Sequence, residues 1–327
     1  MTAGRYVLSV RNTGLGDRII CLCAAWKFAK NTGRKLVVDW RHSLYSTGPA
    51  NLFSSCFESG QTFAGVDLMD VENLDTSRLP RPIYPPAWEQ GNLITSPWLV
   101  SPDSFPDERD KAVALIRSGV DLEAATIVFN GCINDGIISF ADARSCLEAL
   151  RPVKKIREAV DSYHKVYLRS APLIGLHVRH GNGGDIMGHA SSWQSFHTAI
   201  ERCKRAVEFA RDRVGANAAV FLCADSADVE TEIRTNISGV ICRPKPYRPS
   251  GAGELHRGGA AAARLDDALI EMLLLARCNI LIRYPAGSFF SFYAAVMKPT
   301  TAPSPATVRD LLTAFDPTDR LSPAVLF

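Results

Sequence analysis

The second half of the chain alternates between predicted strands and predicted helices, and this alternation constrains the fold more than any other feature. Four apolar, partly β-branched runs are typical of buried strands: 173–178, 218–224, 239–242 and 279–283. Helical patterns follow them in turn: from Ser191 or Ser192 onward, 227–235, 260–277, and from 288 to Lys298. Strict alternation of this kind predicts a parallel, doubly wound α/β domain.

The first half begins with a β-α-β unit. Residues 6–10 and 36–40 predict strands, and the helix between them carries an apolar stripe and ends at Gly33. The turn after the first strand contains Gly14-Leu15-Gly16, which resembles a nucleotide-binding fingerprint but lacks its third glycine. This turn is either a plain tight turn between strand and helix, or part of a cleft that Asp17 and Arg18 help to line.

The rest of the first half is less regular. Residues 41–107 contain many prolines, which disfavour long helices and strands. The later patterns predict a strand at 125–130 and helices at 110–119, 140–150 and 153–167. We take the last helix as the bridge between domains, and a short helix is expected at 307–315. The sequence therefore predicts two α/β domains, residues 1–170 and 171–327, facing each other across a cleft.

Composition excludes several classes of protein. The net charge of +3 over 327 residues lacks the strong basic excess of a protein that lives on nucleic acid. No apolar run approaches the roughly 20 residues that span a bilayer, and the start MTAGRYVLSV does not resemble a signal peptide. The nine cysteines are scattered and form no Cys-x-x-Cys pair. We therefore expect free, buried thiols in a protein of the reducing cytoplasm.

A polar, glycine-rich loop follows the strand at 173–178. It contains Arg179, His180, Asn182, Asp185 and His189 among four glycines, and it leads into a helix. Glycine lets a backbone approach a ligand closely, and a helix N-terminus favours an anion. The guanidinium of Arg179 suits a pyrophosphate, whereas a structural salt bridge is the alternative.

Three strand-to-helix turns of the second half carry polar residues: Arg179 to Asp185, Asp225-Ser226, and Gly287-Ser288. In a parallel sheet these turns lie at the carboxyl edge, so we expect them to converge on one ligand site. Asp225 and Ser226 are read either as helix-capping residues or as contacts to the base or ribose and support for the loop. Ser288 and Ser291 admit the same two readings.

Further candidates stay open between a functional and a structural reading. His177 shares a face of its strand with Arg179, and it is either a site residue or a core histidine. The basic stretch 243–259 is a lid over a diphosphate or a solvated loop; its cations are Arg243, Lys245, Arg248 and Arg257. Aromatic residues suit sugar platforms or core filling: Trp40, Tyr45, Trp88 and Trp98. No Asp-x-Asp occurs, so we expect no metal.

Four stretches of the chain resemble the α-1,6-fucosyltransferase family, and the bacterial nodulation branch in particular. They are HVRHGNGGDIMGHASSW, GLGDRIICLCAAWKFAKNTGRKLVVDW, AVFLCADS and RYPAGSFFSFYAAV. The resemblance implies a GT-B-type fold of two Rossmann-like domains, with GDP-fucose bound by the C-terminal half. It further implies an inverting transfer, without a metal or other cofactor. The acceptor would be O6 of the reducing-end N-acetylglucosamine of a chitin oligosaccharide or lipo-chitooligosaccharide, held by the N-terminal half.

The resemblance also implies roles for particular residues. Arg179 would contact the pyrophosphate of the donor and stabilise its charge, with His180 nearby. The expected donor-binding residues are His177, Arg179, His180, Asn182, Asp225, Ser226, Gly287, Ser288 and Phe289. Animal members carry two adjacent arginines, an Asp-Lys pair and a glutamate base in the loop where this chain has His180, Asn182 and Gly183, so their base has no counterpart here. Of the acidic and polar residues in the loop, we choose Asp185 as the base.

Two other activities are compatible with the same sequence. One is a fucosyltransferase of different linkage or acceptor, and the other is a sugar-nucleotide-binding protein without catalysis. The stretch Arg179-His180-Gly181 also opens the signature of the histidine phosphatases. That signature continues with a second arginine and a proline near the N-terminus, which does not fit here.

Overall fold

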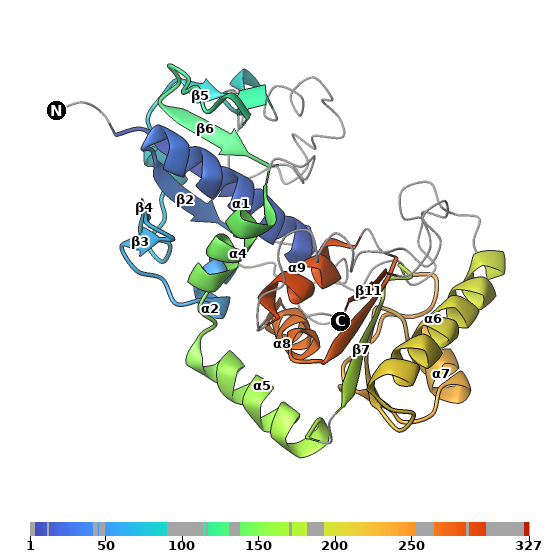
Figure 1. Ribbon diagram of the computed structural model, residues 1–327. Coiled ribbons are helices and arrows are strands. Elements are labelled where there is room, and N and C mark those ends of the chain that lie inside the picture. The colour runs from blue at the N-terminus through green and yellow to red at the C-terminus, as the bar shows by residue number, and fades with distance from the viewer. Residues whose placement is uncertain are drawn as a thin grey trace. The chain divides into compact units, whose positions relative to one another are not determined.

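The computed structural model divides the chain into two compact units, Met1–Val153 and Lys154–Phe327 (Figure 1). The residues that it describes are 4–11, 13–41, 45, 50–89, 114–115, 117–130, 138–169, 172–181, 193–252, 265–285, 288–298 and 324–326. Each unit contains a mostly parallel sheet with helices packed on it, so the predicted α/β class is confirmed.

The sheet of the second unit has the strand order β11-β10-β7-β8-β9. The four predicted strands are all present and parallel: β7 (Leu173–Val178), β8 (Ala219–Ala224), β9 (Val240–Cys242) and β10 (Ile280–Tyr284). The short strand β11 (Ala324–Leu326) was not predicted, and it pairs antiparallel with β10. The helix predicted at 307–315 lies outside the described residues.

Helices cover both faces of this sheet (Figure 1). On one side lie α6 (Trp193–Val214) and α7 (Ala227–Asn236). On the other lie α5 (Lys154–Tyr167), α8 (Leu265–Ala276) and α9 (Phe289–Met297). Gly175 explains how α8 comes so close, because a Cβ there would lie 3.0 Å from Cys278 Sγ and 3.1 Å from a Leu275 methyl group.

Strand alternation sorts the side chains of β7 between these two faces. Ile174, Leu176 and Val178 are buried in the core beneath α6 and α7. His177, which follows the alternation of Gly175, lies on the opposite face, where it contacts α9. The polar side chain therefore stands apart from the apolar core, near the carboxyl end of the strand.

The strand order places a topological switch point in the second unit between β7 and β10. The chain passes from β7 to β8 and β9 on one side, and then returns to β10 on the other. The connections that follow β7 and β10 therefore lead to opposite sides, and ligands of open parallel sheets bind at such a point. Arg179 follows β7 and Ser288 follows β10, so the sequence places polar residues at this point.

The first unit has a parallel sheet in the order β2-β1-β6-β5. Its strands are β1 (Tyr6–Val10), β2 (Lys35–Asp39), β5 (Ile83–Tyr84) and β6 (Thr126–Phe129). The stretch 41–107 holds only short elements in its described part, as the prolines predict: α2 (Leu52–Cys56), β3 (Thr62–Phe63), β4 (Val66–Asp67), and 3-10 turns at Thr76–Arg78 and Pro86–Trp88. Of the helix predicted at 110–119, residues 114–115 and 117–118 are helical, and residues 110–113 and 116 lie outside the described residues.

Two helices pack beside each other in the first unit, α1 (Leu15–Thr32) and α4 (Phe140–Ala149). The apolar side chains of α1 are buried almost around its whole circumference, which is typical of a helix inside a core. Gly33 ends α1 in the left-handed conformation with φ +67°, as its position predicts. Ser139 and Asp142 form a capping box at the start of α4.

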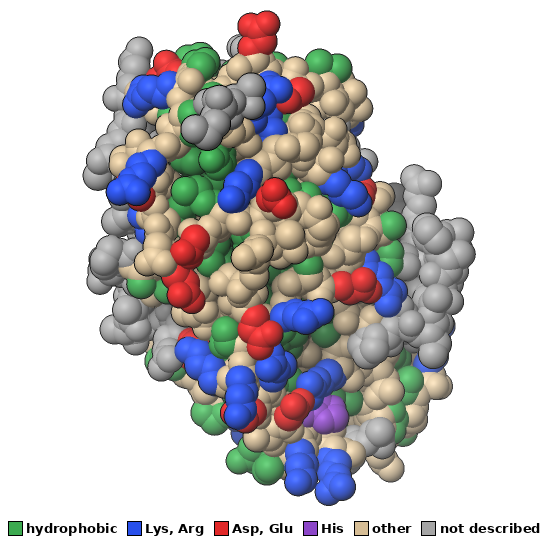
Figure 2. Space-filling model, turned by 90° about the vertical axis from the view of Figure 1, so that its left-hand side faces the viewer, with side chains coloured by type: hydrophobic (Ala, Val, Ile, Leu, Met, Phe, Trp, Pro, Cys, Tyr) green, Lys and Arg blue, Asp and Glu red, His purple; other side chains and the backbone are tan. Residues whose placement is uncertain are grey.

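Charged groups on the surface are mixed in sign. Figure 2 shows Lys and Arg side chains gathered in the lower part of the view, with Asp and Glu side chains standing among them. On α5, for example, Lys154 pairs with Glu158 and Asp161 pairs with Arg277. Exposed ion pairs of this kind are typical of a helix face in contact with solvent.

The described part of the chain contains no helix that is long and apolar enough to cross a membrane. Its cysteines are all free thiols, and every one is buried except Cys242, which is half-buried. The expectation of free, buried thiols is confirmed for these residues, whereas Cys132 lies outside them.

Candidate functional site

Asp225 ties together the turn that follows β7. One of its carboxylate oxygens accepts a hydrogen bond from Arg179 Nη1 at 2.7 Å and another from the backbone N–H of Gly181 at 2.7 Å. The other oxygen accepts from the N–H of His180 at 2.8 Å. Gly181 has φ +80°, a conformation that favours glycine. Of the roles that the sequence left open for Asp225, these hydrogen bonds fit support of the loop.

The electrostatics of Asp225 follow from these contacts. Burial by itself raises the pKa of the carboxyl group, but the Arg179 guanidinium and the two backbone N–H groups outweigh it and lower the pKa below its ordinary value. Asp225 is therefore a carboxylate at neutral pH. Arg179 is 26% exposed, and within the described residues Asp225 is the partner of its guanidinium.

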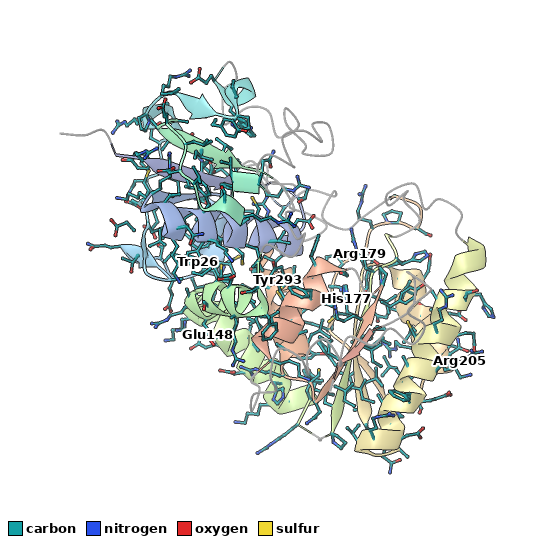
Figure 3. The ribbon with its side chains drawn as sticks, turned by 45° about the horizontal axis from the view of Figure 1, so that its top comes forward. Trp26, Glu148, His177, Arg179, Arg205 and Tyr293 are labelled. Atoms are coloured by element: carbon teal, nitrogen blue, oxygen red, sulfur yellow. The ribbon has the colours of Figure 1, made fainter. Side chains whose placement is uncertain are left out.

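His177 lies one alternation before Arg179 on β7. Its ring stacks on Phe290 of α9 with centroids 4.9 Å apart, and its buried Nδ1 atom has no hydrogen-bond partner among the described residues. Burial lowers the pKa of His177 to about 3. The negative charge of Asp225 acts against this shift, whereas the positive charges of Arg179 and other nearby cations add to it. The imidazole is thus neutral at any working pH. Figure 3 shows His177 and Arg179 at the same end of the sheet.

Arg283 stands beside His177 on the neighbouring strand, in register with it. Its side chain is buried and donates to Ser291 Oγ at 3.2 Å and to the carbonyl of Ser288 at 2.9 Å. Burial lowers its pKa to about 10. Arg283 therefore fixes the start of α9. Ser288 precedes α9 and Ser226 precedes α7, but neither serine caps its helix with its own hydroxyl.

Sequence reasoning missed Arg283 and Phe290. The signal was present for Arg283, because a charged residue inside the apolar run ILIRY resembles His177 inside LIGLHV. Phe290 could not be singled out, since its contact with His177 joins two elements far apart in the sequence. Phe289, the predicted neighbour, is half-buried at the start of α9.

The first residues of the basic stretch are held by carboxylates of α7 and α8. Lys245 makes a buried ion pair with Glu271 at 2.8 Å, Arg243 pairs with Asp267 at 2.6 Å, and Tyr247 donates to Glu230 at 2.6 Å. These contacts fix residues 243–247 in place, so neither a free lid nor a merely solvated loop describes this part. Arg257 lies outside the described residues.

Several predicted site residues lie outside the described part of the chain. They are Asn182, Asp185, His189 and Gly287, together with Trp98. The described aromatic candidates are core residues, because Trp40, Tyr45 and Trp88 are all buried. The reading of these three as exposed sugar platforms is wrong. Trp40, for example, packs edge-on against Phe53.

The arrangement as a whole suits an anion at the carboxyl edge of the second sheet. Arg179 supplies a fixed cation, Asp225 holds it and the turn, and α7 and α9 begin beside them. Among the described residues, no group of three His, Cys, Asp or Glu side chains could hold a metal ion. Arg205, by contrast, lies on α6 at the outer side of the unit (Figure 3).

Known proteins match this chain over most of its length. Residues 3–303 match the family described as nodulation protein Z (NodZ). Nodulation protein Z of Bradyrhizobium diazoefficiens is 36% identical over 298 residues, which cover 90% of this chain and 80% of that protein. The relative from Sinorhizobium fredii is 33% identical, with 90% of this chain and 91% of that protein covered.

Solved structures give the same result. A NodZ α-1,6-fucosyltransferase co-crystallised with GDP matches with a TM-score of 0.72 at 31% identity, covering 91% of this chain and 94% of that one. The same enzyme soaked with GDP-fucose matches with a TM-score of 0.70 at 31% identity, covering 90% and 93%. The predicted GT-B-type α/β fold class is confirmed by these neighbours.

Proposed function

Because the chain belongs to the nodulation protein Z family of fucosyltransferases, we propose that it transfers L-fucose from GDP-β-L-fucose to O6 of the reducing-end N-acetylglucosamine of chitin oligosaccharides or lipo-chitooligosaccharides. The observation that carries the donor half of this proposal is the turn after β7. There Asp225 holds Arg179 at the switch point of the second sheet. The relatives whose structures contain GDP and GDP-fucose share this fold.

The chemistry needs charge stabilisation on the leaving nucleotide. As the bond between fucose and the β-phosphate breaks, negative charge grows on the phosphate oxygens. Arg179 stabilises that charge, and the N-termini of α7 and α9 add their dipoles. Asp225 holds the guanidinium and the turn in place before the donor arrives, so little reorganisation is needed. In this assignment Ser226, Ser288 and Phe289 line the donor site beside His177 and His180.

The acceptor hydroxyl needs a base within hydrogen-bond reach. We assign this role to Asp185, which follows Arg179 in the polar loop, and we assign Asn182 and Gly287 to the donor. The reaction proceeds without a metal ion, because arginine and helix dipoles carry the charge that Mg²⁺ would otherwise balance. The free, buried thiols support a reducing compartment, the cytoplasm.

Incubation of the full chain with GDP-fucose and a chitin oligosaccharide, read by mass spectrometry, tests the proposal. The expected product has gained one fucose, and NMR of the product should locate it at O6 of the reducing-end sugar. Fucose at another position would make the protein a fucosyltransferase of different linkage. Binding of GDP-fucose without any gain in acceptor mass would identify a non-catalytic sugar-nucleotide-binding protein.

The assignment of Asp185 has its own test. Removal of a general base costs about 10²-fold or more in kcat. We therefore expect Asp185→Asn to lower kcat by that factor while the affinity for GDP, measured by calorimetry, stays the same. Near-normal turnover of Asp185→Asn would eliminate this residue as the base.

A further inference from the structure

Arg18, on the first turns of α1, is a buried cation with few partners. Its side chain is 0% exposed, and its Nε donates to the carbonyl of Thr13 at 3.0 Å. Both Nη atoms are buried, and neither has a hydrogen-bond partner within the described part of the chain. Burial lowers the pKa of Arg18 to about 10, with partial compensation from Tyr45 and Asp39, so the group is charged at neutral pH.

Arg34, in the same unit, shows how a buried arginine is normally satisfied. It is 2% exposed, and its guanidinium donates to Asp121 and to four backbone carbonyls, at distances of 2.6 to 3.3 Å. A charged donor that loses such partners costs several kcal/mol in the protein interior. Arg18 therefore calls for an acceptor that the described protein groups do not supply.

Trp40 adds a second donor at the same place. Its ring centroid lies 5.4 Å from the Arg18 guanidinium carbon, and its Nε1 is also buried without a partner. The ring face favours the cation, but it accepts no ordinary hydrogen bond. The nearby carboxylate, Asp39, already makes a two-pronged ion pair with Arg41, at 2.8 and 2.9 Å. Within the described residues no carboxylate hydrogen-bonds to Arg18, so its charge favours an anion over a neutral ligand.

The position in the fold is that of a ligand site. The first sheet has its switch point between β1 and β6, and Arg18 and Trp40 come from the connections that follow β1 and β2. The N-terminus of α1, an 18-residue helix, adds its positive dipole end. Tyr45 reaches the same end, where its hydroxyl accepts from the N–H of Leu15 at 3.2 Å.

We propose that Arg18 and Trp40 hold a small oxyanion of the phosphate type in the core of the first unit. The Nη groups of Arg18 and the Nε1 of Trp40 donate to its oxygens, and its charge balances the excess cation. The bound ion is resident and stabilises the turn between β1 and α1. Two sources share this chemistry, free inorganic phosphate and the diphosphate of a nucleotide. We propose free phosphate as the source, and the experiment below distinguishes the two.

Thermal unfolding of the full chain tests the site, with inorganic phosphate as the probe at constant ionic strength in chloride. A ligand that binds only the folded state raises the Tm, by about 2 °C for each tenfold rise in concentration above its Kd. We expect this rise in the wild type and its loss in Arg18→Met. Trp40→Phe keeps the ring face but removes Nε1, so it should weaken phosphate binding about tenfold.

Arg34→Gln is the matched control, because it removes an equally buried arginine that has all its partners. It should lower the Tm but leave the dependence on phosphate unchanged. An ion that is already bound on purification would mask the rise, so phosphate and sulfate released on denaturation are measured by ion chromatography. One equivalent from the wild type and none from Arg18→Met supports the proposal.

The proposal fails if the wild type neither responds to phosphate nor releases an oxyanion. It also fails if Arg18→Met and Trp40→Phe respond as the wild type does. Titration with GDP in the same assay distinguishes the two sources. A GDP response that survives in Arg18→Met supports free phosphate as the source, whereas a response to GDP alone that depends on Arg18 assigns the oxyanion to the nucleotide.

Discussion

Single residues in the second unit show how one buried carboxylate organises its surroundings. Asp225 satisfies three donors at once, and the pKa of its carboxyl group stays low despite burial because of Arg179 and two backbone N–H groups. The carboxylate and guanidinium are therefore interdependent. Loss of either one leaves the other without its charge partner in a largely buried place.

Arg179→Lys should weaken GDP binding about 10- to 100-fold, because the ammonium group of lysine cannot bond Asp225 and a phosphate in the forked geometry of a guanidinium. Isothermal titration with GDP measures the change. Arg205→Lys, an exposed position on α6, is the control and should bind GDP normally. Unchanged GDP affinity in Arg179→Lys would remove the pyrophosphate role.

His177 gives a pH dependence of stability. Its pKa is about 3 in the folded protein and about 6.5 in the unfolded chain, so between these values only the unfolded chain binds the proton. The stability that it contributes is complete above pH 6.5 and is lost as the pH falls toward 3, by about 1.4 kcal/mol per pH unit. Asp225 adds no pH dependence in most of this window, because its stabilisation is complete above the ordinary carboxyl pKa and is lost only below it.

Urea unfolding of His177→Gln at several values between pH 4.5 and 6.5 checks this prediction. The variant should be less stable than the wild type at pH 7, but its stability should fall less steeply as the pH is lowered. Parallel curves for His177→Gln and the wild type would contradict the low pKa.

At the scale of elements, the turn after β7 depends on a strand that is its neighbour in space and not in sequence. The backbone N–H groups of His180 and Gly181 have their acceptor on Asp225, directly after β8. Asp225→Ala should therefore lower the free energy of unfolding by about 3 kcal/mol and speed amide exchange at residues 180–181. Hydrogen exchange read by mass spectrometry measures this.

Asp212→Ala removes an exposed carboxylate of the same unit and serves as the control. It should leave exchange at residues 180–181 unchanged. Equal protection of these amides in Asp225→Ala and the wild type would mean that the turn is held by other groups.

The strands and helices that the sequence predicted are those with strong local patterns. The runs LIGLHV and AVFLCA are buried strands because almost every residue in them is apolar. The strands β5 and β11 were missed, since each is two or three residues long and exists through pairing with a distant partner. Periodicity cannot reveal pairing of that kind.

The candidate site divides along the same line. Arg179 and Asp225 were recognised from their places after strands, because strand ends in a parallel sheet share one edge. Their direct contact, the stacking of Phe290 on His177 and the burial of Trp40 and Trp88 all depend on packing between distant segments. The sequence pattern thus predicted which strand ends carry the candidate residues, but it did not predict which groups hydrogen-bond or pack together.

At the scale of the whole molecule, the proposed reaction assigns different roles to the two units. We propose that the second unit, Lys154–Phe327, binds the donor at the switch point between β7 and β10. The donor residues of this site come from β7, the start of α7 and the start of α9, all in the second unit. Nucleotide binding should therefore register mainly in that unit.

Hydrogen exchange of the full chain with and without saturating GDP tests this division. A ligand that binds the folded state slows the local opening of the segments it contacts, by about 100-fold when its concentration is 100 times Kd. We expect protection at residues 177–181, 225–230 and 288–292, and much less in the buried strands β2 and β6 of the first unit. Arg179→Lys should lose the difference at GDP concentrations that saturate the wild type. Equal protection of the two sheets would contradict the division, because it would mean that the nucleotide stabilises both units together.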